Sequence, residues 1–207
     1  MKTLTKKDQD AITPEIAFTL LKEGNIRFTK NLKANRNLLQ QANETSDGQH
    51  PFAIVLSCID SRTSAEIIFD QGLGDIFSVR IAGNIINEDI LGSMEFACKA
   101  VGAKIIVVLG HSNCGAIKGA CDHIEMGNLT RLLSKIRPAI DDESTILENR
   151  NSTNESFVEK VALINVNRAT NGIVERSPIL KEMAEQNKIK IIGGMHDLTS
   201  GKVTFTP

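Results

Sequence analysis

Short, unbroken apolar runs recur along this chain, and they constrain its fold more than any other feature. Three of them are FAIVLS at 52–57, IFSV at 76–79 and KIIVVLG at 104–110. Runs of this kind are typical of strands that are buried on both faces. Because segments with helical patterning separate them, we expect an α/β fold with a mainly parallel central sheet flanked by helices.

The first half of the chain also carries helix and loop signals. TPE at 13–15 combines an N-cap, a proline suited to the first helical position and an acid that complements the helix dipole. An apolar stripe over 16–32 predicts a helix that ends near residue 35. TSAE at 63–66 is a capping box that opens another helix, whereas the polar stretch 40–48 predicts a loop.

The second half continues the alternation. We expect helical segments over 114–140, a polar connection over 141–154, a helix over 155–169, a helix restarting at 177–178, and two closing strands within 188–205 that meet at a turn at 200–201. With 207 residues and 41% hydrophobic content, the chain fits one domain. We divide it into an N-terminal helical arm (1–36) and an α/β core (50–207).

Charge and cysteine content narrow the class of protein. The chain carries 24 basic and 25 acidic residues, so no global field favours nucleic acid or an acidic membrane as a partner. Four scattered cysteines suggest reduced thiols. The N-terminus lacks the apolar core of a signal peptide, and no apolar run approaches the ~20 residues of a membrane span. We therefore expect a cytoplasmic protein.

Potential metal ligands follow two of the expected strands. Cys58 ends the first strand and His111 follows the third, and ligands collect at the carboxyl ends of parallel strands. Asp60 should point to the same side as Cys58 along an extended chain, and Cys114 should share a helix face with His111. Two thiolates, an imidazole and a fourth oxygen position suit tetrahedral Zn²⁺, so we expect one zinc ion per chain.

The role of Asp60 decides what such a site can do. If Asp60 binds the metal, water is excluded and the site is structural. If Arg62 holds the carboxylate in a charge-assisted fork, the fourth position is open for a water that zinc converts to nucleophilic hydroxide. Two thiolates donate more charge than two imidazoles, so we expect activity that rises toward alkaline pH.

Each of these residues also has a structural interpretation. Cys58 alone is more often core packing, His111 can be satisfied by backbone, and Cys114 can be a redox thiol at a helix N-terminus. Asp60 can cap a helix, and Arg62 can be a solvated charge. The absence of a Cys-x-x-Cys motif weakens the redox interpretation. Four compatible ligand types at two strand ends favour the metal site.

These motifs resemble those of the β-class carbonic anhydrases. The resemblance rests on CIDSR at 58–62 and HSNCG at 111–115, and it extends through VRIAGN at 79–84, SMEFA at 93–97 and MHDLTSGKV at 195–203. It implies reversible hydration of CO₂ to bicarbonate and a proton. It also implies zinc held by Cys58, His111 and Cys114, with an Asp60–Arg62 dyad that controls the fourth zinc position.

The resemblance further implies a CO₂ pocket and an oligomer. Gln49, Phe77 and Phe96 match residues that form this pocket in related enzymes, and Gly115 offers a close backbone approach. Family members are dimers or higher oligomers, which implies a homo-oligomer here, a dimer or a dimer of dimers. The chain departs from the family pattern at three positions, Ile81, Phe96 and His196. It contains no tryptophan or tyrosine, so the bicarbonate inhibition of one family branch should be absent.

Two other functions remain open at this point. One is a catalytically silent zinc-binding scaffold in which Asp60 stays ligated, and the other is a hydrolase of another small linear molecule such as carbon disulfide. Outside the motifs, Cys98 is expected in the core, and Cys121 with His123 is either an ordinary helix-end pair or a second metal site. The segment 72–74 lacks the features of a dinucleotide loop, and His50 and His196 receive no role.

Overall fold

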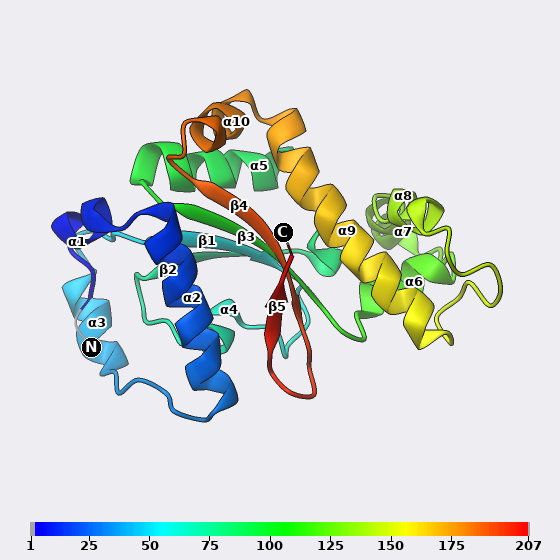
Figure 1. Cartoon of the computed structure of the whole chain (residues 1–207), viewed down its shortest axis with the longest axis horizontal. Coiled ribbons are helices and arrows are strands. Elements are labelled where there is room, and N and C mark those ends of the chain that lie inside the picture. The colour runs from blue at the N-terminus through cyan, green and yellow to red at the C-terminus, as the bar shows by residue number, and fades with distance from the viewer. Residues whose placement is uncertain (1–2, 207) are drawn as a thin grey trace.

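A five-stranded sheet with helices on both faces forms the centre of the computed structural model, which describes residues 3–206 (Figure 1). The strand order is β2-β1-β3-β4-β5. The strands are β1 (Ala53–Ser57), β2 (Ile76–Arg80), β3 (Ile105–His111), β4 (Lys190–His196) and β5 (Val203–Phe205). The first four are parallel and β5 is antiparallel to β4. The expected mainly parallel sheet with a closing C-terminal strand is confirmed.

The unbroken apolar runs lie at the centre of the sheet. Every residue of β1 and of β3 is buried, because each of these strands has a neighbour on both sides and helices on both faces. Strand β2 forms one edge, and its burial alternates instead. The carboxyl ends of β1 and β3 are thus adjacent, with Ser57 in register with Leu109.

Helices cover the two faces and one end of the sheet. The helices are α1 (Lys6–Ala11), α2 (Pro14–Thr29), α3 (Leu38–Glu44), α4 (Ala65–Ile68), α5 (Glu88–Glu95), α6 (Gly115–Cys121), α7 (Gly127–Leu133), α8 (Arg137–Asp142), α9 (Glu155–Arg176) and α10 (Pro178–Glu185). A 3₁₀ turn, η1 (Ala82–Asn84), follows β2, and a π-helical segment, η2 (Phe96–Val101), follows α5. Residues of α5, η2, α9 and α10 pack on one face, and residues of α2 and α4 pack on the other.

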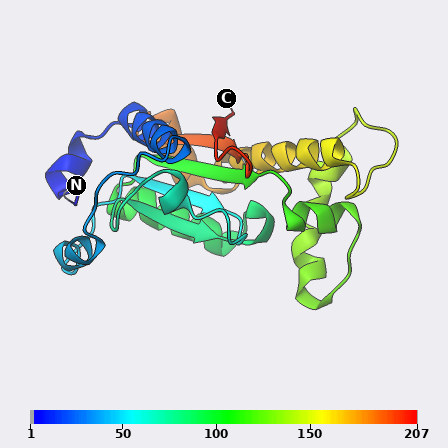
Figure 2. The ribbon, with the colours of Figure 1, turned by 90° about the horizontal axis from the view of Figure 1, so that it is seen from below.

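A third apolar cluster lies beyond the sheet. It joins side chains of α6, α8 and α9 and includes Cys58 and Cys114. In both views α6, α7 and α8 gather at one end of the molecule, and α1 and α3 lie at the other (Figures 1 and 2). The end formed by α6, α7 and α8 therefore covers the edge of the sheet where the two segments with potential metal ligands emerge.

Helix α2 starts where the sequence predicts it, but its buried face and its last residue differ from the prediction. Helix α2 begins at Pro14, with Thr13 accepting a hydrogen bond from the Ile16 amide. It ends at Thr29 rather than near residue 35, and Ile16 is 45% exposed. The buried Asn25 sets the rotation of the helix, because its side chain binds backbone groups of three other residues. These are Ile68, Gly201 and Val203.

Three further local predictions were wrong. The stretch 40–48 is not only loop, because α3 occupies much of it, with Asn37 accepting from the Gln40 amide as its cap. Thr63 does not cap α4. Its hydroxyl donates to the carbonyls of Cys58 and Asp60 instead, and α4 has no side-chain cap. Helix α9 continues to Arg176, seven residues beyond the predicted end at residue 169.

Across residues 3–206, no helix combines the length and apolar content needed to cross a bilayer.

Candidate metal centre

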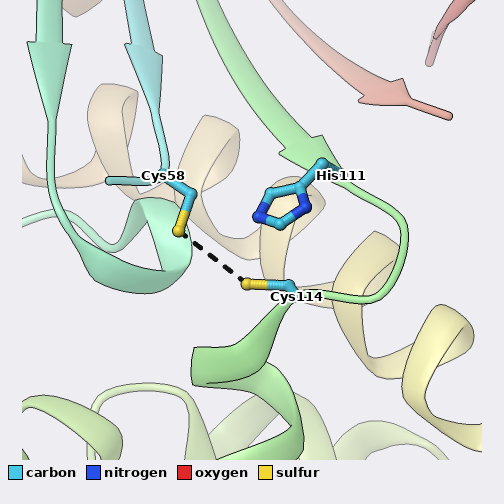
Figure 3. Close-up of side chains that lie close together, drawn as sticks. All are labelled: Cys58, His111 and Cys114. Carbon is cyan, nitrogen blue, oxygen red and sulfur yellow. Dashed lines mark hydrogen bonds between the residues drawn. The ribbon is translucent and has the colours of Figure 1, made fainter. Parts of the chain in front are cut away.

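Cys58, His111 and Cys114 converge at the carboxyl edge of the sheet. Cys58 directly follows β1, His111 is the last residue of β3, and Cys114 precedes α6. Their ligand atoms all lie within 4.8 Å of one another, and the two Sγ atoms are 3.9 Å apart. In Figure 3 the His111 ring lies beside the two sulfur atoms. All three side chains are buried.

His111 and Cys114 approach each other by a route that differs from the predicted one. They do not share a helix face, because β3 ends at His111 and α6 begins only at Gly115. A turn joins the two residues, with Asn113 in the left-handed region at φ 54°. Asparagine tolerates this conformation better than most residues. The proximity was predicted correctly, but its cause is a turn.

The donor set fits a zinc ion. The His111 Nδ1 atom lies 2.9 Å from the Ser112 carbonyl, so we assign the ring proton to Nδ1. The Nε2 atom is then an acceptor, and it is buried without a hydrogen-bond partner among residues 3–206. Two sulfurs bonded to one tetrahedral zinc at ~2.3 Å lie about 3.8 Å apart, close to the observed separation. A hydrogen bond from the Cys114 thiol lowers the pKa of Cys58.

Asp60 lies beside this group but is bound to Arg62. Arg62 donates to one carboxylate oxygen through Nε (2.9 Å) and to the other through Nη2 (2.8 Å), and its backbone amide also donates to the carboxylate (3.0 Å). These hydrogen bonds hold the pKa of Asp60 well below its usual range. Asp60 is not part of the three-residue ligand group found among the described residues. Asp60 is therefore held by Arg62 and lies outside the group of three potential metal ligands.

Two residues that support Cys58 were missed as site residues. Arg80 donates to the carbonyls of Cys58 (3.0 Å) and Asp60 (2.5 Å), and the Gly83 amide donates to the Cys58 sulfur (3.4 Å). Gly83 has φ 68°, and an added Cβ would lie 2.7 Å from Ile136 Cδ1. Both residues belong to the VRIAGN motif, but nothing in that motif alone indicates a contact with a cysteine.

The expected pocket residues do not all lie near Cys58, His111 and Cys114, which we call the cluster from here on. Gly115 directly follows Cys114, but Phe77 and Phe96 lie together with ring centroids 6.3 Å apart. They line a groove of about 590 Å³ along the β2 edge, and none of the three cluster residues lines it. Gln49 precedes the amino end of β1, whereas Cys58 follows its carboxyl end. Within one chain, the three residues are therefore separated from the cluster along the strands.

Comparison with known proteins decides the family. The family model for carbonic anhydrase matches residues 53–203, which span β1 to β4 and contain Cys58, His111 and Cys114. The chain belongs to the β-class carbonic anhydrases. It is a carbonate dehydratase, which interconverts CO₂ and bicarbonate.

Three relatives of this carbonic anhydrase match it over nearly their full length. Carbonic anhydrase 2 of Mycobacterium tuberculosis is 33% identical over 198 residues, covering 93% of this chain and 92% of the relative. The carbonic anhydrase of Mycolicibacterium smegmatis is 33% identical and covers 92% of each chain. The solved β-carbonic anhydrase CcaA is 26% identical, with a TM-score of 0.71 over 92% of this chain and 95% of that one.

The remaining cysteines and histidines of this carbonic anhydrase lie outside the cluster. Cys98 is buried in the core as expected, and burial raises its pKa to about 12. Cys121 is buried as well, and no second group of potential ligands occurs within the described residues. His196 is the register partner of His111 on β4, and burial lowers its pKa.

Proposed function

We propose that this carbonic anhydrase binds one zinc ion per chain through Cys58, His111 and Cys114. The observation that carries the proposal is the pair of sulfurs 3.9 Å apart beside a buried imidazole nitrogen with no hydrogen-bond partner within residues 3–206. When bound, zinc supplies Lewis acidity, which makes water nucleophilic near neutral pH. The buried side chains hold the donor atoms together and exclude bulk water from them.

Asp60 and Arg62 then form the catalytic dyad. Arg62 occupies both carboxylate oxygens and keeps Asp60 from the fourth ligand position. The lowered pKa keeps Asp60 ionised across the neutral range, so it acts only as a hydrogen-bond acceptor. In this role it orients the attacking water toward CO₂. Gly115 leaves room for substrate, since a Cβ there would meet no atom within 4 Å.

A second copy of the chain completes the CO₂ pocket in this proposal. Gln49, Phe77 and Phe96 lie toward the amino ends of β1 and β2 or at the β2 edge, away from the cluster of their own chain. Phe96 is 58% exposed in the single chain. A homodimer built along the β2 edge can bring these residues to the partner's metal centre, and a dimer of dimers can follow.

Rapid-mixing kinetics test the proposal. Zinc-loaded protein should hydrate CO₂ in a stopped-flow assay and contain one metal ion per chain. Cys58→Ser should lose metal and activity, whereas Asp60→Asn should keep the metal and lose most of the activity. Metal content without CO₂ hydration would identify a silent scaffold in which Asp60 is ligated. Hydrolysis of carbon disulfide in place of CO₂ hydration would identify the other alternative.

We also propose a cytoplasmic location. Four cysteines without a disulfide in the described residues suit a reducing compartment. Fractionation of the source cells with antibody detection tests this, and recovery only in an oxidising compartment would contradict it.

A further inference from the structure

A cavity of about 300 Å³ lies between α8, α9 and the segment that follows η1. None of the three cluster residues lines it. Three basic side chains do, those of Lys135, Arg168 and Arg176, together with the carboxylate of Glu175. A cavity of this size lies at the lower end of the range for small-molecule sites, which is ~300–1,000 Å³.

Within residues 3–206, two of the three cations have no anionic partner. Arg168 is paired with Asp142. Among residues 3–206, the Lys135 ammonium makes no ion pair or hydrogen bond, and the Arg176 guanidinium makes one long bond of 3.5 Å to the Ile86 carbonyl. Glu175 forms no ion pair with either cation in this part of the chain. Unpaired cations in a concave site favour an anionic ligand, since charge-assisted hydrogen bonds are stronger than neutral ones.

The rest of the cavity wall is apolar apart from Asn165, whose side-chain amide donates to the Gly83 carbonyl. Ile85, Ile86, Pro138 and Ala169 line it. Ile86 packs closely against α9 because Gly172 lacks a side chain; a Cβ there would lie 2.6 Å from Ile86 Cδ1. Apolar walls with a few polar groups are typical of sites for small organic molecules rather than for bare inorganic ions.

We propose that this cavity binds a small organic oxyanion. Its anionic oxygens lie between Lys135 and Arg176, and its apolar body lies against Ile86 and Pro138. Carboxylates and phosphate monoesters share this chemistry. Glu175 weakens binding, because its carboxylate lies in the same cavity as the anion.

Isothermal titration calorimetry on the zinc-loaded full chain tests this proposal. Benzoate and phenyl phosphate are the anionic probes, and benzyl alcohol is the neutral one. We expect saturable binding of at least one anion with a stoichiometry of one per chain and weaker binding of benzyl alcohol. The tighter anion identifies the headgroup that the site prefers.

Variants locate the binding to this cavity. The double variant Lys135→Gln/Arg176→Gln should bind the preferred anion about tenfold more weakly or worse, and Glu175→Gln should bind it about twofold more tightly. The exposed Lys188→Gln serves as the matched control and should leave affinity unchanged. Anion binding that persists in the double variant, including binding at the metal, would overturn the proposal. So would equal binding of benzyl alcohol or no saturable binding to the wild type.

Discussion

At the scale of single residues, the proposed role of the Asp60–Arg62 fork is to control the fourth ligand position of the metal. The Asp60 side chain is 16% exposed, whereas that of Arg62 is 57% exposed, so the fork lies at the boundary between the buried cluster and solvent. The Arg62 guanidinium binds the carboxylate, and the proposed zinc ion would compete with it for the same oxygens. Removing the guanidinium should therefore favour ligation of the metal by Asp60.

Substitution of Arg62 tests this competition. Arg62→Gln should lower kcat/KM for CO₂ hydration by about tenfold or more, because the free carboxylate takes the open position. Zinc content should remain at the wild-type level. Stopped-flow kinetics and metal analysis measure the two effects, with Arg131→Gln as a surface control. Full activity in Arg62→Gln would show that the fork has no part in catalysis.

Gly83 gives a second test at this scale. Its positive φ and its close approach to Ile136 exclude a side chain. Gly83→Ala should lower the free energy of unfolding by about 1–3 kcal/mol, measured by urea denaturation. Gly48→Ala is the matched control, because a Cβ there meets no atom within 4 Å. Equal stability of the two variants would contradict this account of Gly83.

At the scale of elements, Asp70 ties α2 and the chain after it to the end of α4. It accepts hydrogen bonds from Arg27 (2.5 Å) and Arg36 (2.6 Å) and from the Ala34 amide. The side chains of Asp70 and Arg36 are 5% and 7% exposed. Burial acts to raise the pKa of Asp70, but the two guanidinium groups and the amide outweigh it, and the pKa is lowered.

Asp70→Asn should therefore destabilise the fold, by ~3 kcal/mol at neutral pH, because it leaves the buried Arg36 and the partly buried Arg27 without their anion. Asparagine tolerates the positive φ of 45° at this position, so backbone strain is not added. The pKa of Asp70 in the folded state lies below the unfolded value of ~3.9. The stabilisation that its carboxylate gives the fold is therefore complete above that pH, and it is lost as the pH falls through the folded-state pKa.

Urea denaturation at neutral and acidic pH measures this difference. The gap between wild type and Asp70→Asn should shrink as the pH falls below about 4. The exposed Asp47→Asn is the control and should stay within ~0.5 kcal/mol of the wild type. A gap that is the same at both pH values would show that the ionised carboxylate is not its source.

The sequence predicts where strands and helices lie better than it predicts which face of a helix is buried. It also does not predict which residues hold Cys58 in place. Apolar runs locate the central strands β1 and β3 because these strands are buried on both faces. The proximity of Cys58 and His111 was predictable because both lie at the carboxyl ends of parallel strands, where ligands collect. The buried face of α2 was not predictable, because Asn25 bonds to backbone far along the chain. Arg80 and Gly83 likewise act through contacts that only the folded chain creates.

At the scale of the whole molecule, the proposed pocket spans two chains. If Gln49, Phe77 and Phe96 serve the partner's metal centre, a defect in the pocket and a defect in the metal site can complement each other. In a homodimer of either defective variant, every active site would lack one of its two halves. A heterodimer would contain one site with both halves intact and one with neither.

Tandem-tag purification of such a heterodimer gives the test. Cys58→Ser and Phe77→Ala/Phe96→Ala should each be strongly impaired as homodimers. The heterodimer should recover about half of the wild-type CO₂ hydration rate, because one of its two sites is intact. Sedimentation velocity checks the dimer. A heterodimer as inactive as its parents would mean that the pocket residues act within their own chain.

The short closing strand has a consequence for assembly. A sheet has two edges at which further strands can add, and β5 occupies one of them with three residues that run against their neighbour. A short antiparallel strand is a poor template for addition, so the longer β2 is the edge that remains attractive. Two copies that meet along β2 use that edge up in both. Growth by strand addition is then self-limiting and ends at a closed pair rather than a fibre.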